Sequence, residues 1–345
     1  MNNKILGLIF VSIIFLSGGC GSNDYLLDED KNVIVYEETG QQLRKDILCL
    51  PSEDTEIYEI YKEHEKQMDH KLKDLPNCEN FNINSNESQS LWEGIFVKPT
   101  AYAISGLGKV VGNLGIAVIL VGLLIRIVLL PLQIKTSRQT INMKKATPEL
   151  QKLEKKYANK TDTDSQMMKS QEMMAIYRKY KINPLTGCLP ALIQLPIFFA
   201  FLNAIYRLPS IYEQSLFGFN LGMTPSTGIS NGEYQYLFLM VLIAVSTYFS
   251  FKHTMKQSTA VNEEQAKQTK TMLNFMTVMI LFSSLFFPAA LHFYWIVTYL
   301  FIAVQTEVIN HILGEKKIEI KKINTKIKKS SIKDKLDKKE GKGKK

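Results

Sequence analysis

Cysteine is scarce in this sequence of 345 residues, and its spacing excludes the usual metal and redox motifs. The four cysteines are Cys20, Cys49, Cys78 and Cys188, which lie too far apart for a zinc site or a Cys-x-x-Cys pair. The long apolar stretches also contain no aspartate pair, no histidines at metal-ligand spacing and no Gly-x-Ser-x-Gly turn. We therefore expect neither an enzyme nor a bound cofactor.

Charge is also scarce, at 22% of residues against 46% hydrophobic ones, and it is concentrated outside a set of apolar runs. About 20 apolar residues cross the roughly 30 Å hydrocarbon core of a bilayer as a helix. The run that begins at Met272 is too long for one span, and Pro288 divides it. We therefore predict an all-α membrane protein whose core, residues 113–312, has five transmembrane helices at about 114–134, 187–206, 234–251, 272–287 and 289–311.

The connections between these spans alternate in basic content, which predicts their orientation. Lys and Arg are abundant in the first and third connections and in the C-terminal tail, and nearly absent from the others. The positive-inside rule then places the N-terminus outside and the C-terminus in the cytoplasm. The first connection, 135–183, has apolar residues at helical spacing on both sides of a polar turn. We expect a cytoplasmic helical hairpin whose second helix opens on a capping box of Thr163 and Gln166.

The N-terminus predicts export and a lipid anchor at a bacterial cell membrane. Residues 1–19 contain a short apolar run followed by small residues, directly before Cys20. This pattern resembles the signal peptide of a bacterial lipoprotein, in which the cysteine carries palmitate or a similar chain. The usual leucine three positions before the cysteine is replaced by Ser17, and ordinary cleavage nearby is the alternative.

Residues 20–91 form an acidic segment that this signal would export. Because the segment has few large apolar residues, we expect either a small external domain or a partly disordered tether, with a solvated helix from Ile57 to Leu75. Cys49 and Cys78 both lie in it. An oxidising compartment favours a disulfide between them, and two free thiols are the alternative.

Two further segments flank the core. Residues 92–112 mix aromatic and small apolar residues with lysines near the ends, which predicts an interfacial amphipathic helix; a soluble core helix is the alternative. Residues 313–345 are rich in lysine, which predicts a disordered cytoplasmic tail that binds anionic lipid or ribosomal RNA. A bare topology signal is the alternative for this tail.

The first predicted span carries a single charge, Arg126. An arginine near the middle of a span costs about 2.5 to 3.5 kcal/mol on insertion scales, so the fold must offset this cost. Helical spacing places Gly115, Gly122 and Gln133 on the same face as Arg126, and this face is small and polar. We expect it to contact protein or water. A structural ion pair between Arg126 and Glu307 is the alternative.

Three stretches carry a resemblance to a known family. The first span has Arg126 followed by Leu-Pro-Leu from Leu130. The second stretch reads YKINPLTGCLP from Tyr180 and QLPIFF from Gln194, and the third reads FPAALHFYW from Phe287. In this order, over about residues 92–312, they resemble the YidC, Oxa and Alb family of membrane protein insertases, in its bacterial lipoprotein branch.

The resemblance implies a function and a site. Members enclose a hydrophilic groove, open to the cytoplasm and to lipid, in which the arginine receives the polar external segment of a nascent membrane protein. The resemblance also implies a chaperone role, contact with the ribosome through the hairpin and tail, and action alone or beside the Sec translocon. The residues that we assign to the groove are Arg126, Gln194, Ser250, Trp295, Tyr299 and Thr306.

Two departures and one rival function accompany this assignment. Ala290 replaces the glycine that is usual in the family, and the third span has Ser250 near the place where many members have a groove glutamine. Core packing alone is the alternative for the aromatic residues of the last span. The rival is a small-solute transporter or channel with Arg126 in an anion path. Against this rival, the sequence has no inverted repeats and no second charge within the spans beyond Glu307.

Overall fold

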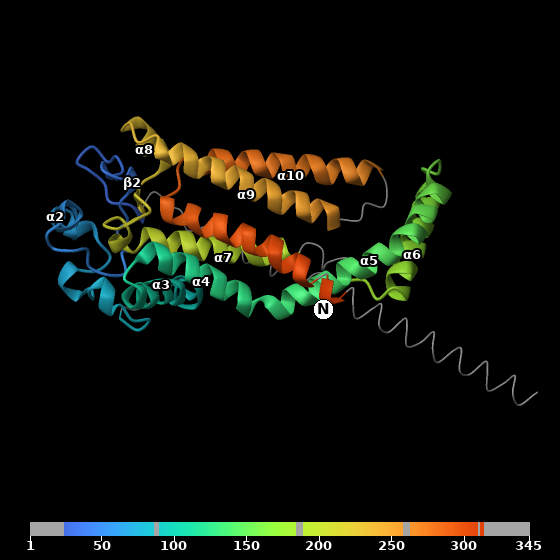
Figure 1. Cartoon of the computed structure of the whole chain (residues 1–345), viewed down its shortest axis with the longest axis horizontal. Helices are drawn as coiled ribbons and strands as arrows, with labels where there is room; N and C mark the ends of the chain where they lie inside the picture. Colours follow the sequence, from blue (N-terminus) through green and yellow to red (C-terminus); the bar gives the residue numbers. More distant parts are fainter. Residues whose placement is uncertain (1–23, 86–89, 184–188, 258–262, 310, 314–345) are drawn as a thin grey trace, which may run out of the picture.

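The computed structural model describes residues 24–85, 90–183, 189–257, 263–309 and 311–313. Figure 1 shows a mainly helical, elongated molecule with an N-terminal unit at one end, a bundle of helices in the middle and a helical hairpin at the other end. The predicted signal peptide, Cys20 and nearly all of the basic tail lie outside the described residues.

The N-terminal unit, residues 24–85, is a small packed body with little regular structure. Its core includes Leu26, Leu43 and Tyr61, none of which is exposed. A disulfide joins Cys49 to Cys78 within it. This segment is therefore a folded unit rather than a tether. Its elements are β1 (Val35–Tyr36) paired antiparallel with β2 (Gln41–Gln42), α2 (Glu56–Glu63), and three 3-10 turns at Glu65–Gln67, Leu72–Asp74 and Cys78–Asn80.

The helix predicted from Ile57 to Leu75 is shorter in the structure and is not simply solvated. α2 ends at Glu63, and the ring of the next residue, His64, bonds the Ile60 carbonyl at 3.0 Å. The chain then turns, so that Leu72 and Leu75 also enter the core. The sequence prediction was wrong here because regular helical spacing does not reveal such a turn.

Buried polar contacts attach the N-terminal unit to the helical bundle. Gln41 Nε2 donates a hydrogen bond to the Gly222 carbonyl at 2.7 Å, and the Leu48 amide donates to the Arg207 carbonyl at 2.9 Å. Beside them lies a buried set of charged side chains, here called the Arg207 cluster: Arg44, Asp46, Glu93, Lys98 and Arg207.

The predicted interfacial segment forms a π-helical turn, Glu93–Val97, followed by α3, Lys98–Val111. Gly112 ends α3 in the left-handed conformation, with φ of 75°, which glycine adopts without strain. One face of α3 packs on α4, and outward residues such as Val110 remain exposed. Lys98 is fully buried and pairs with Glu93, so it is not the interfacial charge that the sequence suggested.

The first apolar stretch is bent rather than straight. α4 (Leu114–Val128) begins where the Asn113 side chain accepts hydrogen bonds from the Gly115 and Ile116 amides. It meets α5 (Leu130–Tyr157) at an angle of 56°. Pro131 lies in the first turn of α5, where it lacks an N–H and crowds the preceding turn. The predicted span over 114–134 therefore consists of α4 and the start of α5, which meet at a bend, and its crossing of the membrane stays a prediction.

α5 and α6 (Thr163–Lys179) form the hairpin, which projects from the bundle in Figure 1. Ion pairs join the two helices, including Lys179 Nζ to Glu149 Oε1 at 2.6 Å. The N-cap of α6 is Asp162, which accepts from the Ser165 amide at 2.8 Å. The predicted capping box of Thr163 and Gln166 is therefore wrong by one residue, because the aspartate one position earlier takes the N-cap position.

The rest of the bundle consists of three long helices and the last helix, Ala289–Leu313. The short connector before the last helix contains Phe287 and Pro288. The other elements are α7 (Leu189–Tyr206), a 3-10 turn (Pro209–Ile211), β3 (Ser215–Leu216) paired with β4 (Phe219–Asn220), α8 (Pro225–Ser230), α9 (Gln235–Gln257) and α10 (Glu263–Ser284).

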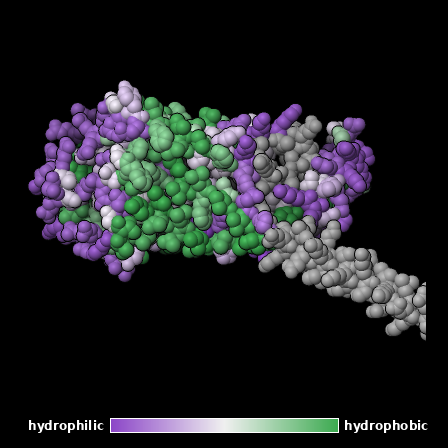
Figure 2. Space-filling view, viewed as in Figure 1, coloured by the Kyte–Doolittle hydropathy of each residue, from purple (hydrophilic) through white to green (hydrophobic). Residues whose placement is uncertain are grey.

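A hydrophobic band covers the middle of the molecule on the face shown in Figure 2, between hydrophilic ends. Among the described helices, two are long and apolar enough to cross a bilayer, at Gln235–His253 and Ala289–Leu313. The bent pair α4 and α5 supplies a third if it counts as one span. The architecture is that of a mostly α-helical membrane protein, and the number of five spans stays a prediction.

Candidate functional site

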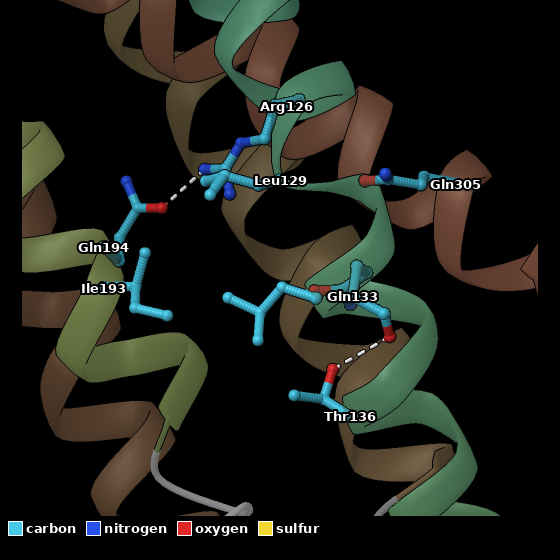
Figure 3. A pocket seen from close by; sticks show the side chains of 8 residues that line it. Arg126, Leu129, Gln133, Thr136, Ile193, Gln194 and Gln305 are labelled. Carbon is cyan, nitrogen blue, oxygen red and sulfur yellow. Dashed lines mark hydrogen bonds between the residues drawn. The ribbon is translucent and has the colours of Figure 1, made fainter.

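Arg126 lies in the last turn of α4, directly before the bend at Leu129. Its side chain is partly buried and points toward α7, as Figure 3 shows. Because α5 turns away from α4 at the bend, a cavity remains beside the guanidinium of Arg126. The sequence placed the arginine near the middle of a continuous span, whereas the structure places it just before the break between α4 and α5.

The partner of Arg126 is an uncharged amide. Arg126 Nη2 donates a hydrogen bond to Gln194 Oε1 at 2.6 Å, and Gln194 Nε2 donates to the Tyr294 hydroxyl at a longer 3.4 Å. Gln194 thus orients Arg126 without cancelling its charge.

The proposed ion pair between Arg126 and Glu307 is not formed. Glu307 Oε2 instead lies 3.3 Å from His253 Nε2, and its side chain is 72% exposed. Among the residues that the structure describes, no carboxylate forms an ion pair with Arg126. The predicted alternative, an ion pair of Arg126 with Glu307, is therefore wrong.

A cavity of about 40 Å³ lies beside Arg126, at the junction of α4, α5, α7 and the last helix. Figure 3 shows Gln194 on one side of the arginine and Gln305 on the other, with Gln133 and Thr136 further along α5. The cavity is lined by Arg126, Leu129, Leu132, Gln133, Thr136, Ile193, Gln194 and Gln305. Its polar groups are amides and a hydroxyl, so Arg126 supplies the only full charge among these lining residues.

Close packing of the last helix on α4 fixes the position of Tyr294. A Cβ atom on Gly122 would lie 2.7 Å from Tyr294 Cδ2 and 3.2 Å from Thr298 Cγ2. Only glycine therefore allows this approach, which brings the Tyr294 hydroxyl to Gln194. The Tyr294 ring also stacks on Phe201 of α7, with centroids 4.2 Å apart.

The remaining predicted groove residues lie around this site, but they do not line the cavity. Trp295 is buried and stacks on Phe198 of α7 at 5.5 Å, and Tyr299 contacts Phe251 of α9 at 6.5 Å. Thr306 donates to the carbonyl of Ile302 on its own helix, and Ser250 is buried in α9. The aromatic residues therefore pack between helices, which agrees with the core-packing alternative.

Tyr294, Thr298 and Gln305, which face α4 or the cavity, were not predicted from the sequence. They lie one position before Trp295, Tyr299 and Thr306, whose place in a substrate groove stays a prediction. The signal that could have found them is the spacing of Tyr294, Thr298 and Gln305 at four and seven residues, which is equally helical.

The chemistry of the site is electrostatic. A guanidinium has five N–H donors, and the Gln194 bond engages one of them. The residues that line the cavity include no carboxylate, cysteine or histidine to act as base or nucleophile. No cluster of histidine, cysteine or acidic residues suited to a metal lies within the part of the chain that the structure describes. The site can attract an anionic group and donate hydrogen bonds to it.

Comparison with known proteins identifies the relatives of this chain. A family model described as 60Kd inner membrane protein matches residues 106–317. The membrane protein insertase MisCA of Bacillus subtilis (strain 168) is 38% identical over 221 residues, which cover 64% of this chain and 79% of the relative. The membrane protein insertase YidC of Oceanobacillus iheyensis is 36% identical over 233 residues, covering 67% and 88%. The membrane protein insertase YidC 1 of Bacillus anthracis is 32% identical over 251 residues, covering 72% and 92%.

Proposed function

Because the chain belongs to the YidC/Oxa family of membrane protein insertases, we propose that it inserts newly made proteins into the bacterial cell membrane and assists their folding. The observation that carries the mechanism is the pairing of Arg126 with the neutral Gln194. A charge within a membrane segment is expensive, and an unpaired one is a functional site by default.

The charge of Arg126 attracts the acidic external segment of a substrate. In a site shielded from bulk water, the attraction between opposite charges is several times stronger than in water. The segment enters where the bend between α4 and α5 opens the cavity lined by Gln133, Thr136 and Gln305. These amide and hydroxyl groups form hydrogen bonds with polar side chains of the substrate segment, in place of part of the water that the segment loses on entry.

The hydrophobic segment of the substrate takes a different path. Large apolar side chains are exposed along α9 and α10, including Phe238, Val241, Phe275 and Phe282. These surfaces are suited to lipid and to an apolar helix. The substrate helix moves along them into the bilayer while its polar segment is held at Arg126. The process involves transfer between environments and no chemical reaction.

The proposal also includes the orientation of the protein in the membrane and its partner molecules. Five spans place the N-terminal unit outside and the hairpin of α5 and α6 in the cytoplasm, with a lipid anchor at Cys20. The hairpin and the lysine-rich tail contact the ribosome, and the protein acts alone or beside the Sec translocon. Support for the ribosome contact is the basic character of both segments.

Insertion of a single-span reporter with an acidic external segment tests the proposal. Arg126→Lys keeps the positive charge and should retain most insertion, whereas Arg126→Ala should lose it. Protein abundance in the membrane is the control for misfolding. Full insertion by a stable Arg126→Ala variant would contradict the role of the charge. Anion flux through the wild type without insertion would favour the transporter instead.

A further inference from the structure

A second cavity, of about 270 Å³, lies where the N-terminal unit meets the helical bundle. Gln41 and Gln42 of β2 line it from the N-terminal unit. Tyr206 at the end of α7 and Ser226 at the start of α8 line it from the bundle. In Figure 1 this junction is at the end of the molecule opposite the hairpin. The family model begins at residue 106, so four of the nine residues that line this cavity precede the matched region.

The lining of this cavity carries no charge and combines polar side chains with Phe286 and Phe287. Its polar side chains are the amides of Gln41 and Gln42 and hydroxyls from tyrosine, threonine and serine. The neighbouring Arg44, whose guanidinium lies 5.4 Å from the centre of the Tyr25 ring, is paired with Asp46. Amides and hydroxyls supply both donors and acceptors, as a polypeptide backbone requires. The cavity therefore suits a neutral polar chain and has no preference for one sign of charge.

α7 connects this cavity with the one at Arg126. Gln194 lines the first cavity and Tyr206 lines the second, and the residues between them span about 18 Å of helix. Phe198, one turn after Gln194, packs on Phe287 at 5.9 Å and on Trp295 at 5.5 Å. Phe287 itself lines the second cavity. A cluster of three aromatic rings therefore packs at Phe198, which lies between Gln194 and Tyr206 along α7, and one of the rings lines the second cavity.

One ring of this cluster lies outside any helix. Phe287 belongs to the connector between α10 and the last helix. A hydrogen bond from the Ser226 amide to the Leu285 carbonyl, at 3.0 Å, holds this connector to α8. Movement of Phe287 would open the ring cluster without unwinding a helix.

We propose that the second cavity is the exit site for the polar external segment of an inserted protein, which binds there as an extended, uncharged stretch of polypeptide after passing the Phe198, Phe287 and Trp295 rings. This inference rests on the proposed insertase function and goes beyond it, because it assigns a receiving site to the N-terminal unit. Arg126 selects the segment by charge, and the exit site holds it without charge selection.

Photocrosslinking of the full-length protein in membrane vesicles tests this order of events. A photoreactive amino acid replaces Gln133 at the first cavity, Gln42 or Ser226 at the second, or Lys62 on the exposed face of α2 as the control. The probe is a ribosome-bound single-span reporter of increasing length, whose external segment carries one acidic residue among neutral polar ones. We expect crosslinks at Gln133 for shorter chains, crosslinks at Gln42 and Ser226 only for longer ones, and none at Lys62.

The other outcomes are distinguishable. Insertion with crosslinks at Gln133 but none at Gln42 or Ser226 at any length would overturn the exit site and leave the proposed function intact. Crosslinks from the second cavity to lipid or glycan alone would also overturn it. Absence of both insertion and Gln133 crosslinks would contradict the proposed function, and the exit site with it.

A cavity-filling pair of variants provides a second measurement. Ser226→Trp places a large ring in the cavity, whereas Ser230→Trp places the same ring one turn later on α8, at an exposed position. We expect Ser226→Trp to reduce insertion of a reporter with a long external segment severalfold, and to leave a reporter with a short one unchanged. Ser230→Trp should affect neither. Equal insertion of the long reporter by both variants would overturn the exit site.

Discussion

Two arginines of this protein occupy opposite electrostatic environments. Arg207 is almost fully buried and contacts two carboxylates, with Nη2 at 3.0 Å from Glu93 Oε1 and Nε at 3.1 Å from Asp46 Oδ2. Arg126 lies in an apolar helix and contacts the neutral amide of Gln194. The first arginine has its charge balanced within the fold, and the second does not.

The difference separates a structural charge from a functional one. Carboxylates and hydrogen bonds around Arg207 compensate its loss of water, and the cluster joins the N-terminal unit, α3 and α7. Gln194 holds Arg126 in place but leaves its charge available to an incoming group. We expect substitutions at Arg207 to affect stability first, and substitutions at Arg126 to affect insertion first.

Arg207→Ala should have the largest effect on stability. It leaves Asp46 and Glu93 buried without their shared cation, and breaking a buried ion pair costs about 3 to 5 kcal/mol. Thermal unfolding in detergent and resistance of the N-terminal unit to protease would measure the loss. A variant as stable as the wild type would show that the cluster contributes nothing to docking.

Arg126→Leu should shift stability in the opposite direction. Removing an arginine from a membrane segment relieves about 2.5 to 3.5 kcal/mol on insertion scales. We expect unchanged or greater thermal stability together with loss of reporter insertion. A destabilised Arg126→Leu variant would mean that Arg126, like Arg207, is mainly structural.

Loss of the disulfide should destabilise only the N-terminal unit. The Cys49–Cys78 bond spans 29 residues, and a cross-link of this length contributes about 2 to 4 kcal/mol. Cys78→Ser should therefore increase proteolysis of residues 24–85, while Arg126 and its cavity remain intact. Protease mapping with and without reductant is the measurement, and identical digestion patterns would contradict the expectation.

Acid should weaken the Arg207 cluster but not the pairing of Arg126. Burial raises the pKa of Asp46, but the hydrogen bond from Arg44 and the charge of Arg207 outweigh it, so the pKa lies below its ordinary value of 3.8. The stabilisation is complete above that value and is lost as pH falls through the lowered pKa. Asp46→Asn should remove this part of the pH dependence. The measurement is the free energy of unfolding of the wild type and of Asp46→Asn between neutral and acidic pH. The same pH dependence in both proteins would show that Asp46 has no such role.

Tyr294→Phe should have the smallest effect. It removes the long hydrogen bond from Gln194 and leaves the ring packed on Gly122, which corresponds to about 0.5 to 1.5 kcal/mol. We expect a modest fall in insertion and almost unchanged stability. Complete loss of insertion by this variant would assign Tyr294 a larger role than orientation of Gln194.

The two arginines also show what the sequence could and could not predict. Arg126 was found because a charge in a long apolar run is a local signal, and its neighbour Gln194 followed from the family motif. The Arg207 cluster was not found, because its members come from residues 44 to 207 and meet only after folding. In the sequence, Arg207 lies in a connection that is nearly free of Lys and Arg, and Lys98 lies in the segment predicted to be interfacial, so neither position indicated a buried cluster.

Geometry within single helices was also only partly predictable. Pro131 was noted in the sequence, but periodicity did not indicate that it bends the span by 56°. On the last helix, periodicity did not distinguish Tyr294, which packs on Gly122 of α4, from Trp295, which stacks on Phe198 of α7. The N-terminal unit has a small core, and a disulfide and contacts with the bundle help to hold its fold. Composition does not reveal these long-range contacts.

The most direct test of the account exchanges the neutral partner of Arg126 for a charged one. Gln194→Glu places a carboxylate beside the guanidinium and balances its charge, whereas Gln194→Met keeps the side-chain size and leaves the charge free. The measurement is insertion of a reporter with an acidic external segment by the two variants at equal abundance. The account predicts that Gln194→Glu loses insertion and that Gln194→Met retains most of it. Full insertion by Gln194→Glu would contradict the central claim that an unbalanced charge at Arg126 receives the substrate.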